Sequence, residues 1–201
     1  MHIKKLVVKN FRLLYEVELL LESSTTVIVG RNNCGKTSLS DIIRRFLNDR
    51  ATFQIEDFSN ASYDGFCAAL KARLEGKPDE EIRKLIPSIE LRVHIEYKPD
   101  IPTFGPLSEF IIDVNDTCTE AIVVCRYALK EGSIKALFEG YEEITLERDP
   151  QEVSADVQLA YFKSLKDQIP RLFMSQFWAE DPNDSSNQKP VTQSAISLFL
   201  S

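Results

Sequence analysis

The stretch that decides the fold is TTVIVGRNNCGKTSL, which spans residues 25–39. Residues 30–37 within it match the pattern G-x-x-x-x-G-K-[ST] at every fixed position. The preceding residues 25–29 are all β-branched, which predicts a strand that is buried on both faces of a parallel sheet. From residue 37 to about residue 48, apolar side chains recur every three or four positions, which predicts an amphipathic helix. A strand, a glycine-containing loop and a helix in this order are the context that a phosphate-binding loop requires.

The composition of the loop suits the binding of phosphate groups. Phosphate oxygens need many donors at short range, and successive backbone N–H groups of a curled loop supply them as an anion nest. Gly30 and Gly35 permit backbone angles and a close approach that a Cβ would block, and Asn33 tolerates left-handed geometry. The helix that begins near Lys36 adds the positive end of its dipole. The candidate ligand-binding residues of the loop are Gly30, Arg31, Asn32, Asn33, Cys34, Gly35, Lys36, Thr37 and Ser38.

The side chains at the start of the helix have distinct predicted tasks. Lys36 brings a mobile ammonium group to the β- and γ-phosphates and is the candidate catalytic residue. The hydroxyl of Thr37 is the candidate ligand of Mg²⁺. Ser38 is expected to cap the helix or to touch the α-phosphate, whereas Cys34 is expected to act through its backbone alone. These roles predict a nucleoside triphosphate and Mg²⁺ as the bound cofactors.

The overall composition is that of a soluble globular chain. The 201 residues include 24 Lys+Arg and 31 Asp+Glu, which give a formal net charge of −7, and 43% of the residues are hydrophobic. These values exclude a collagen-like chain, bulk disorder and a coiled-coil rod. The negative net charge also argues against a nucleic-acid-binding surface that extends over the whole chain. The N-terminus is nevertheless locally positive, through Lys4, Lys5, Lys9 and Arg12.

The sequence also predicts a cellular compartment. No apolar run approaches the roughly 20 residues that span a bilayer, and the first residues alternate in polarity rather than forming the apolar block of a signal peptide. We therefore expect a cytoplasmic protein with no membrane partner, in which the cysteines are reduced thiols. The four cysteines are Cys34, Cys67, Cys118 and Cys125.

Outside the loop, hydrophobic patterning predicts further strands and helices. The predicted strands are residues 3–9, 16–22, 88–97, 121–129 and 134–147, and the first two are expected to pair as a hairpin. The predicted helices are residues 65–75, 79–86 and 153–168. Residues 1–178 are thus expected to form one lobe, with Trp178 in its core. Residues 179–194 are expected to form an exposed loop or linker, and residues 195–201 to begin a further helix that breaks off.

Three segments resemble one group of ATPases. LVVKNFR at residues 6–12 is similar to the N-terminal strand and turn of ABC-type ATPase heads in the RecF, SMC, Rad50 and OLD (overcoming lysogenization defect) group. The loop GRNNCGKTSL resembles the OLD-type pattern G-x-N-N-x-G-K-T/S, and Glu56-Asp57-Phe58 resembles an acidic-Phe segment that often follows the first helix in OLD-like proteins. The resemblance implies an α/β fold of the P-loop NTPase type. The chain would then form the N-terminal lobe of an ABC-type head, with an antiparallel strand layer beside a partial parallel sheet and flanking helices.

The same resemblance implies ATP as the nucleotide and a role for Arg12. Arg12 is expected to lie near the nucleotide or to contact it across a dimer, and the alternative of a surface arginine on a turn stays open at this point. Asn10 is expected to form the turn itself, since asparagine favours such positions. For the full-length protein, the resemblance implies a homodimer of ATPase heads that couples ATP to DNA-directed activity in phage defence or DNA repair. Its partners would then include DNA and a nuclease domain or subunit.

Two motifs that the resemblance implies for hydrolysis are missing from the sequence. The seven glycines include no adjacent pair, so no L-S-G-G-type signature is present. The nearest Walker B lookalike, FIID at residues 110–113, has no following Glu and is expected to be a decoy. We therefore expect the chain alone to bind nucleotide poorly and hardly to hydrolyse it. Two other hypotheses stay open, namely a stand-alone P-loop kinase or GTPase-like enzyme and a nucleotide-sensing scaffold that does not hydrolyse.

Overall fold

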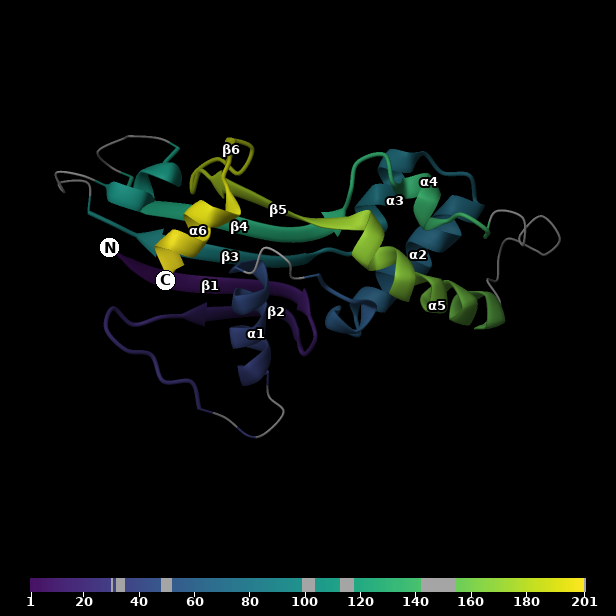
Figure 1. The fold of residues 1–201 in the computed structure, drawn as a ribbon, viewed down its shortest axis with the longest axis horizontal. Coiled ribbons are helices and arrows are strands. Elements are labelled where there is room, and N and C mark those ends of the chain that lie inside the picture. The colour runs from purple at the N-terminus through teal and green to yellow at the C-terminus, as the bar shows by residue number, and fades with distance from the viewer. Residues whose placement is uncertain are drawn as a thin grey trace.

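Figure 1 shows a computed structural model of the chain, which describes residues 1–29, 31, 35–47, 52–98, 104–112, 118–141 and 155–200. Its centre is a six-stranded sheet in the order β2-β1-β3-β4-β5-β6, in which every neighbouring pair is antiparallel. The strands are β1 (His2–Phe11), β2 (Leu14–Leu20), β3 (Ile89–Glu96), β4 (Glu120–Leu129), β5 (Phe173–Glu180) and β6 (Gln188–Pro190). The α-helices are α1 (Lys36–Leu47), α2 (Ser62–Leu74), α3 (Asp79–Leu85), α4 (Ile134–Leu137), α5 (Ala155–Leu172) and α6 (Gln193–Leu200). Two short 3-10 helices are η1 (Ile55–Asp57) and η2 (Gly105–Glu109).

The sheet has one apolar and one charged face, because side chains alternate along each strand. In β3, Leu91 and Val93 belong to the hydrophobic core, whereas Glu90 lies on the opposite face. The helices α1 and α6 cover the apolar face, and the ring of Phe46 in α1 lies 6.2 Å from the ring of Phe177 in β5. Figure 1 shows these two helices in front of the sheet and α2 to α5 gathered at one end of it.

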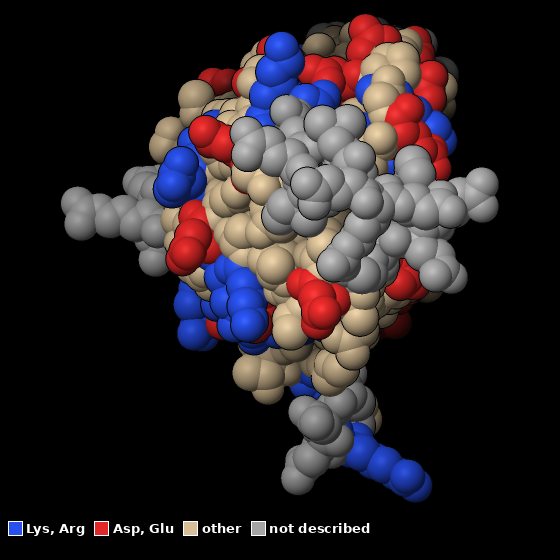
Figure 2. Space-filling view, turned by 90° about the vertical axis from the view of Figure 1, so that its right-hand side faces the viewer, with Lys and Arg blue, Asp and Glu red and all other residues tan. Residues whose placement is uncertain are grey.

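The helices at that end are joined to the sheet by packing and by hydrogen bonds. The ring of Phe66 in α2 lies 6.5 Å from the ring of Phe173, the first residue of β5. Arg83 of α3 donates to the carbonyls of Leu129 and Lys130 at the end of β4, both at 2.9 Å. In Figure 2, which views the molecule from this end, Lys and Arg side chains lie beside Asp and Glu side chains. The visible described surface therefore presents mixed charge to a partner.

Residues 25–29 are the main departure from the predicted fold. They form no strand, and Val27 and Val29 are 76% and 84% exposed, so the predicted buried strand is wrong. β-branched residues favour a strand only where neighbouring strands supply hydrogen-bond partners, and within the described ranges no strand pairs with these five residues. The expected parallel part of the sheet is likewise not found in the described part of the chain, where every strand pair is antiparallel.

The segment after β4 also differs from its prediction as a strand over residues 134–147. Residues 134–137 form α4, residues 138–141 are turns, and residues 142–147 lie outside the described residues. Ile134, Leu137 and Phe138 are spaced as on one helical face and are at most 4% exposed. Burial of this face therefore outweighs the alternating pattern that favoured a strand.

The strand β5 was not predicted, and it begins directly after α5. Trp178 in β5 is half-buried on the charged face rather than in the core, and the guanidinium of Arg126 lies 4.9 Å from the centre of its ring. The predicted exposed loop over residues 179–194 is wrong at its start, because Ala179 and Glu180 end β5 and residues 179–181 are buried. Residues 182–190 are exposed as expected, but they include β6, which pairs with β5.

The other predicted elements are confirmed in the described structure. They are the hairpin of β1 and β2, the helices α1, α2, α3 and α5, and the strands β3 and β4. Among the helices that the structure describes, none is both long enough and apolar enough to cross a lipid bilayer.

Candidate nucleotide-binding site

The helix α1 begins at Lys36, directly after the glycine-containing loop. Its first backbone hydrogen bond runs from the N–H of Leu39 to the carbonyl of Gly35, at 3.0 Å. The first turn of α1 holds no acidic residue, so the helix does not neutralise the positive end of its own dipole. Thr37 is exposed at this helix end, whereas Ser38 is only 7% exposed. Thr37 is thus better placed than Ser38 to meet a ligand.

The side chain of Lys36 reaches back to the other described end of the loop. Its Nζ donates to the carbonyl of Arg31 at 2.7 Å. A carbonyl oxygen and a phosphate oxygen are both acceptors for such a group. The loop residues that lie outside the described part of the chain are Gly30, Asn32, Asn33 and Cys34.

Gly35 lies against the turn between β1 and β2. Its φ is +91°, a backbone conformation that residues with a side chain rarely adopt. A Cβ at this position would lie 2.8 Å from Cδ2 of Leu14 and 3.9 Å from Cβ of Leu13. The backbone angle therefore favours glycine here, and a Cβ would also displace the end of the Leu14 side chain.

The hairpin of β1 and β2 has two left-handed residues near its turn that are not glycine. Asn10 has φ +60° and Arg12 has φ +49°. The segment that follows α1 holds this turn, because the N–H of Arg12 donates to the carbonyl of Asp57 at 2.9 Å and the N–H of Ser59 donates to the carbonyl of Asn10 at 3.0 Å. The Asn10 side chain also donates to the carbonyl of Ser88 at 2.9 Å. Asn10 is the next-to-last residue of β1 rather than a residue of the two-residue turn, Arg12-Leu13, and it ties the strand end to the segments around residues 59 and 88.

Four charged residues, which we call the arginine clamp, join this turn to α1. They are Arg12, Asp41, Arg45 and Asp57. Arg12 donates to Asp41 at 2.7 Å and to Asp57 at 3.0 Å. Arg45 donates to Asp57 at 2.9 Å, and its Nε lies 3.8 Å from Asp41. The Asp57 side chain is 6% exposed. Two positive and two negative charges therefore balance within one cluster.

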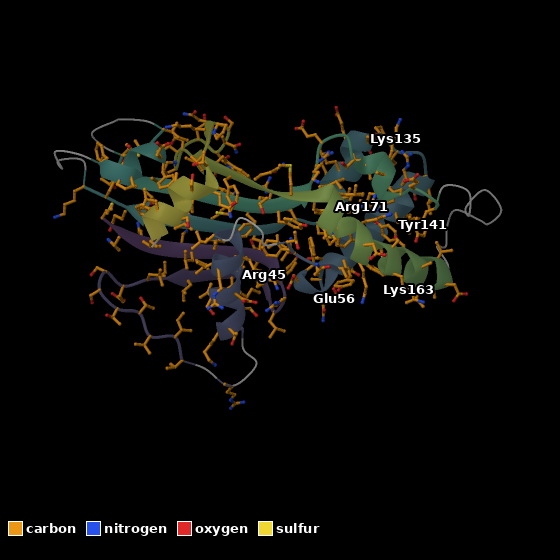
Figure 3. The ribbon with its side chains drawn as sticks, in the orientation of Figure 1. Arg45, Glu56, Lys135, Tyr141, Lys163 and Arg171 are labelled. Atoms are coloured by element: carbon orange, nitrogen blue, oxygen red, sulfur yellow. The ribbon has the colours of Figure 1, made fainter. Side chains whose placement is uncertain are left out.

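Sequence reasoning identified Arg12 and the segment that holds Asp57, but it missed the two members of the clamp on α1. The i,i+4 spacing of Asp41 and Arg45 was a signal for an ion pair on the polar face of the helix. Only the path of the chain after α1, which returns Asp57 to that face, shows what the pair contacts. Figure 3 shows Arg45 on α1 and Glu56 on the neighbouring η1 segment.

A surface hollow of about 380 Å³ lies beside the clamp. Its lining residues are Arg12, Leu13, Tyr15, Glu56, Phe58, Ser59, Asn60 and Ala61. Leu13 also lies 3.9 Å from the position of a Cβ at Gly35. The hollow and the start of α1 are therefore separated by the same turn.

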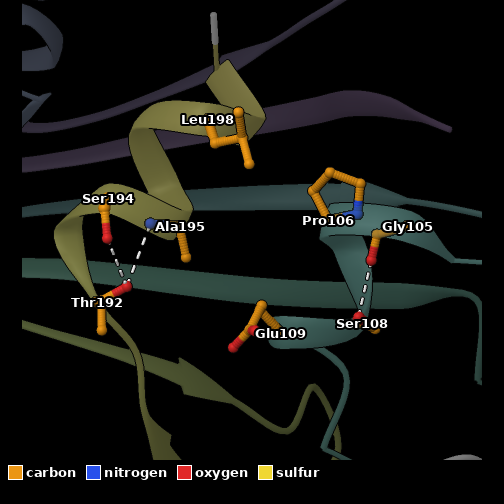
Figure 4. Close-up of a pocket in the computed structure, with 8 residues that line it drawn as sticks. All are labelled: Gly105, Pro106, Ser108, Glu109, Thr192, Ser194, Ala195 and Leu198. Atoms are coloured by element: carbon orange, nitrogen blue, oxygen red, sulfur yellow. Dashed lines mark hydrogen bonds between the residues drawn. The ribbon is translucent and has the colours of Figure 1, made fainter.

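A second hollow, of about 470 Å³, lies between η2 and α6 (Figure 4). Its hydroxyl groups are used in local hydrogen bonds. The Thr192 hydroxyl accepts from the N–H of Ala195 at 3.2 Å, and the Ser108 hydroxyl donates to the carbonyl of Gly105 at 2.7 Å. Leu198 beside them is 68% exposed. These groups end η2 and begin α6, which gives them a structural role.

The charged face of the sheet carries a network separate from the clamp. Arg92 donates to Glu90 at 2.6 Å and to Glu180 at 2.7 Å, and Arg126 donates to Glu90 at 2.6 Å. Burial acts to raise the pKa of Glu90, but the hydrogen bond from Arg92 and the charge of Arg126 outweigh it and lower the pKa overall. Asp113 of the Walker B lookalike lies outside the described residues.

Comparison with known families identifies the family of the chain. A family model described as AAA ATPase domain matches residues 1–194. No protein of curated function matches the sequence. Because the family model covers nearly the whole chain, the protein belongs to the AAA ATPase domain family.

Proposed function

We propose that the chain binds ATP with Mg²⁺ through residues 30–38, as the nucleotide-binding lobe of an OLD-like, ABC-type ATPase. Membership of the AAA ATPase domain family supports ATP binding and ATPase function in general. The observation that supports phosphate binding by residues 30–38 is the position of Lys36, whose ammonium group donates to the carbonyl of Arg31 at 2.7 Å. A phosphate group held by the loop would offer this ammonium a charged acceptor in place of a neutral one.

The described residues fit a triphosphate with its metal ion. The first turn of α1 carries no acidic side chain that would repel an anion. Lys36 would hold the β- and γ-phosphates, and the exposed Thr37 would hold Mg²⁺ through its hydroxyl. When bound, Mg²⁺ would neutralise part of the charge on the phosphate oxygens.

We further propose that hydrolysis depends on a second ATPase head. Positioning and electrostatic stabilisation supply most of the catalysis of phosphoryl transfer, so half of a site turns over slowly. The sequence of residues 1–201 offers neither an adjacent glycine pair for a signature motif nor a Glu after the apolar run at residues 110–112. In this proposal the signature motif belongs to a part of the full-length protein outside residues 1–201, and ATP-dependent homodimerisation brings it from the partner head to the loop. The resemblance of residues 6–12 and of the loop to OLD-like proteins supports coupling to DNA and to a nuclease domain or subunit, in phage defence or DNA repair.

Calorimetric titration of the chain with MgATP and MgGTP tests nucleotide binding. The wild-type chain is expected to bind MgATP more tightly than MgGTP. Lys36→Ala is expected to weaken MgATP binding by about 10- to 150-fold, the range for losing hydrogen bonds to a charged group. Lys71→Ala is the matched control, since Lys71 lies on α2 and pairs only weakly, at 3.9 Å, with Glu75. Equal affinities of the wild-type and Lys36→Ala chains would overturn the proposal.

A further inference from the structure

Asp57 is the most enclosed member of the arginine clamp, and both of its carboxylate oxygens are engaged. Oδ1 accepts from Nε and Nη2 of Arg12, each at 3.0 Å. Oδ2 accepts from Nη1 of Arg45 at 2.9 Å and from the N–H of Gln54 at 2.9 Å. Hydrogen bonds between ionised partners are about twice as strong as neutral ones, so this carboxylate fixes both guanidinium groups.

The clamp ties together three segments that are distant in the sequence. Arg12 comes from the turn between β1 and β2, Arg45 comes from α1, and Asp57 ends η1. Each guanidinium also lies over an aromatic ring, since Cζ of Arg12 is 5.0 Å from the ring centre of Phe11 and Cζ of Arg45 is 5.5 Å from that of Phe53. The two arginines are therefore held both at their donor groups and at their flat faces.

This arrangement bears on the phosphate loop because α1 is a continuous helix from Lys36 to Leu47. Asp41 lies four residues after Thr37, or about 6 Å along the helix axis. A contact that fixes Asp41 and Arg45 therefore fixes the direction in which the first turn of α1 points its N–H groups. Arg12 fixes the segment that packs against the end of the loop. Leu14, two residues after Arg12, lies against Gly35.

We propose that Asp57 is a positioning residue for nucleotide binding, which holds α1 and the β1–β2 turn in the relative orientation that forms the phosphate site. The inference rests on the proposed function, because it concerns the affinity of that same loop. Asp41 and Asp57 neutralise Arg12, so Arg12 acts through the placement of its turn rather than as a cation for the terminal phosphate. Loss of Asp57 therefore weakens MgATP and MgADP alike, because the loop grips the β-phosphate of both.

The test is calorimetric titration of the 201-residue chain with MgATP and with MgADP, with thermal unfolding recorded for every variant. Asp57→Asn keeps the shape of the side chain and removes its charge. We expect a loss of about tenfold or more for both nucleotides in the folded protein, since small displacements of a binding constellation have effects of this size. Asp79→Asn is the matched control, because it removes an Asp–Arg pair, to Arg73 at 3.3 Å, on α3. It is expected to leave both dissociation constants unchanged.

Arg45→Gln provides a second route to the same answer if Asp57→Asn does not fold. It breaks the contact from the side of α1 and is expected to produce the same parallel loss for MgATP and MgADP. In the double variant, the loss is expected to be no greater than in either single variant, because both remove one shared interaction. Folded variants with wild-type affinity for MgATP would overturn the inference, and so would a loss confined to MgATP.

The Lys36→Ala variant separates this inference from the proposed function. If Lys36→Ala abolishes binding while Asp57→Asn and Arg45→Gln bind as tightly as the wild type, the inference alone fails. If binding by the wild type does not depend on Lys36, the proposed function fails and the positioning role fails with it. Parallel losses in all three variants support both.

Discussion

Gly35 and Leu14 approach so closely that a Cβ on the glycine would come within 2.8 Å of the Leu14 side chain. The end of the phosphate loop and the β1–β2 turn are therefore packed against each other. We expect Gly35→Ala to lower the free energy of unfolding by about 2 kcal/mol, through the clash and through the backbone angle of +91°. We also expect it to weaken MgATP binding. Chemical denaturation and calorimetry measure the two effects.

Gly76→Ala separates the two causes. Gly76 has φ +72°, but a Cβ there would meet no atom within 4 Å. Its expected cost is about 1 kcal/mol from the backbone angle alone, with no effect on nucleotide binding. The added substitution Leu14→Ala is expected to restore part of the affinity that Gly35→Ala loses. If Gly35→Ala and Gly76→Ala lowered the free energy of unfolding equally and neither weakened MgATP binding, the contact between Gly35 and Leu14 would have no role in stability or binding.

Residues 25–29 provide a second prediction. Val29 is 84% exposed, whereas Val93 in β3 is 2% exposed. Val29→Ala is therefore expected to change the free energy of unfolding by less than about 0.5 kcal/mol, as exposed substitutions do. Val93→Ala is expected to cost about 2 kcal/mol, because it leaves a cavity in the core. If thermal or chemical unfolding showed similar costs for both, residues 25–29 would be buried after all.

These two valines also illustrate what the sequence could and could not predict. The helix α1 and the hairpin of β1 and β2 follow from local periodicity, which the chain carries within each segment. Whether residues 25–29 are buried depends on which strands lie beside them, and their own β-branched composition holds no information about that neighbour. The pattern G-x-x-x-x-G-K-T and the helix that follows it could therefore be recognised in the sequence, while the environment of the preceding segment could not.

The arginine clamp shows the same limit at the candidate site. Arg12 and Asp57 lie in segments that could be singled out by resemblance, and Asp41 and Arg45 have a spacing that favours an ion pair. Their meeting requires the chain to return after α1 so that Phe58 pairs with Phe11. Such a contact is set by tertiary packing. A single sequence therefore shows which residues are charged, but it does not show that these four residues meet.

A third prediction concerns the pH dependence of stability. The pKa of Glu90 is lower in the folded protein than in the unfolded chain, where it is about 4.3. Its contribution to stability is therefore fully present above about pH 5 and is lost as the pH falls through the folded pKa. Glu90→Gln is expected to cost about 2–3 kcal/mol at pH 7, since it leaves Arg92 and Arg126 without their shared carboxylate.

Thermal unfolding of the wild type and of Glu90→Gln from pH 7 to pH 3 measures this effect. The difference between the two melting temperatures is expected to shrink toward low pH, because the wild type loses the same charge by protonation. Glu56→Gln is the control, since the hydrogen bond from Lys166 also lowers the pKa of Glu56, but its side chain is 58% exposed. It is expected to have no measurable effect. A difference for Glu90→Gln that stays constant with pH would contradict the assignment.

The fourth prediction concerns a buried hydroxyl between α4 and α5. Tyr161 is fully buried, its ring stacks 5.8 Å from that of Phe138, and its hydroxyl has no hydrogen-bond partner among the described residues. Burial raises the pKa of Tyr161, so the hydroxyl stays protonated. Tyr161→Phe keeps the ring and removes the unsatisfied group, and is expected to raise the free energy of unfolding by about 1 kcal/mol.

Tyr141→Phe is the matched comparison, because the hydroxyl of Tyr141 donates to the carbonyl of Ala160 at 2.9 Å. Its loss is expected to lower the free energy of unfolding by about 1 kcal/mol. For a chain of this size, 1 kcal/mol corresponds to a shift of roughly 2–4 °C in the melting temperature, so the two variants should move in opposite directions by a measurable amount. If Tyr161→Phe instead lowered the melting temperature as much as Tyr141→Phe, the hydroxyl of Tyr161 would have a hydrogen-bond partner in the folded protein.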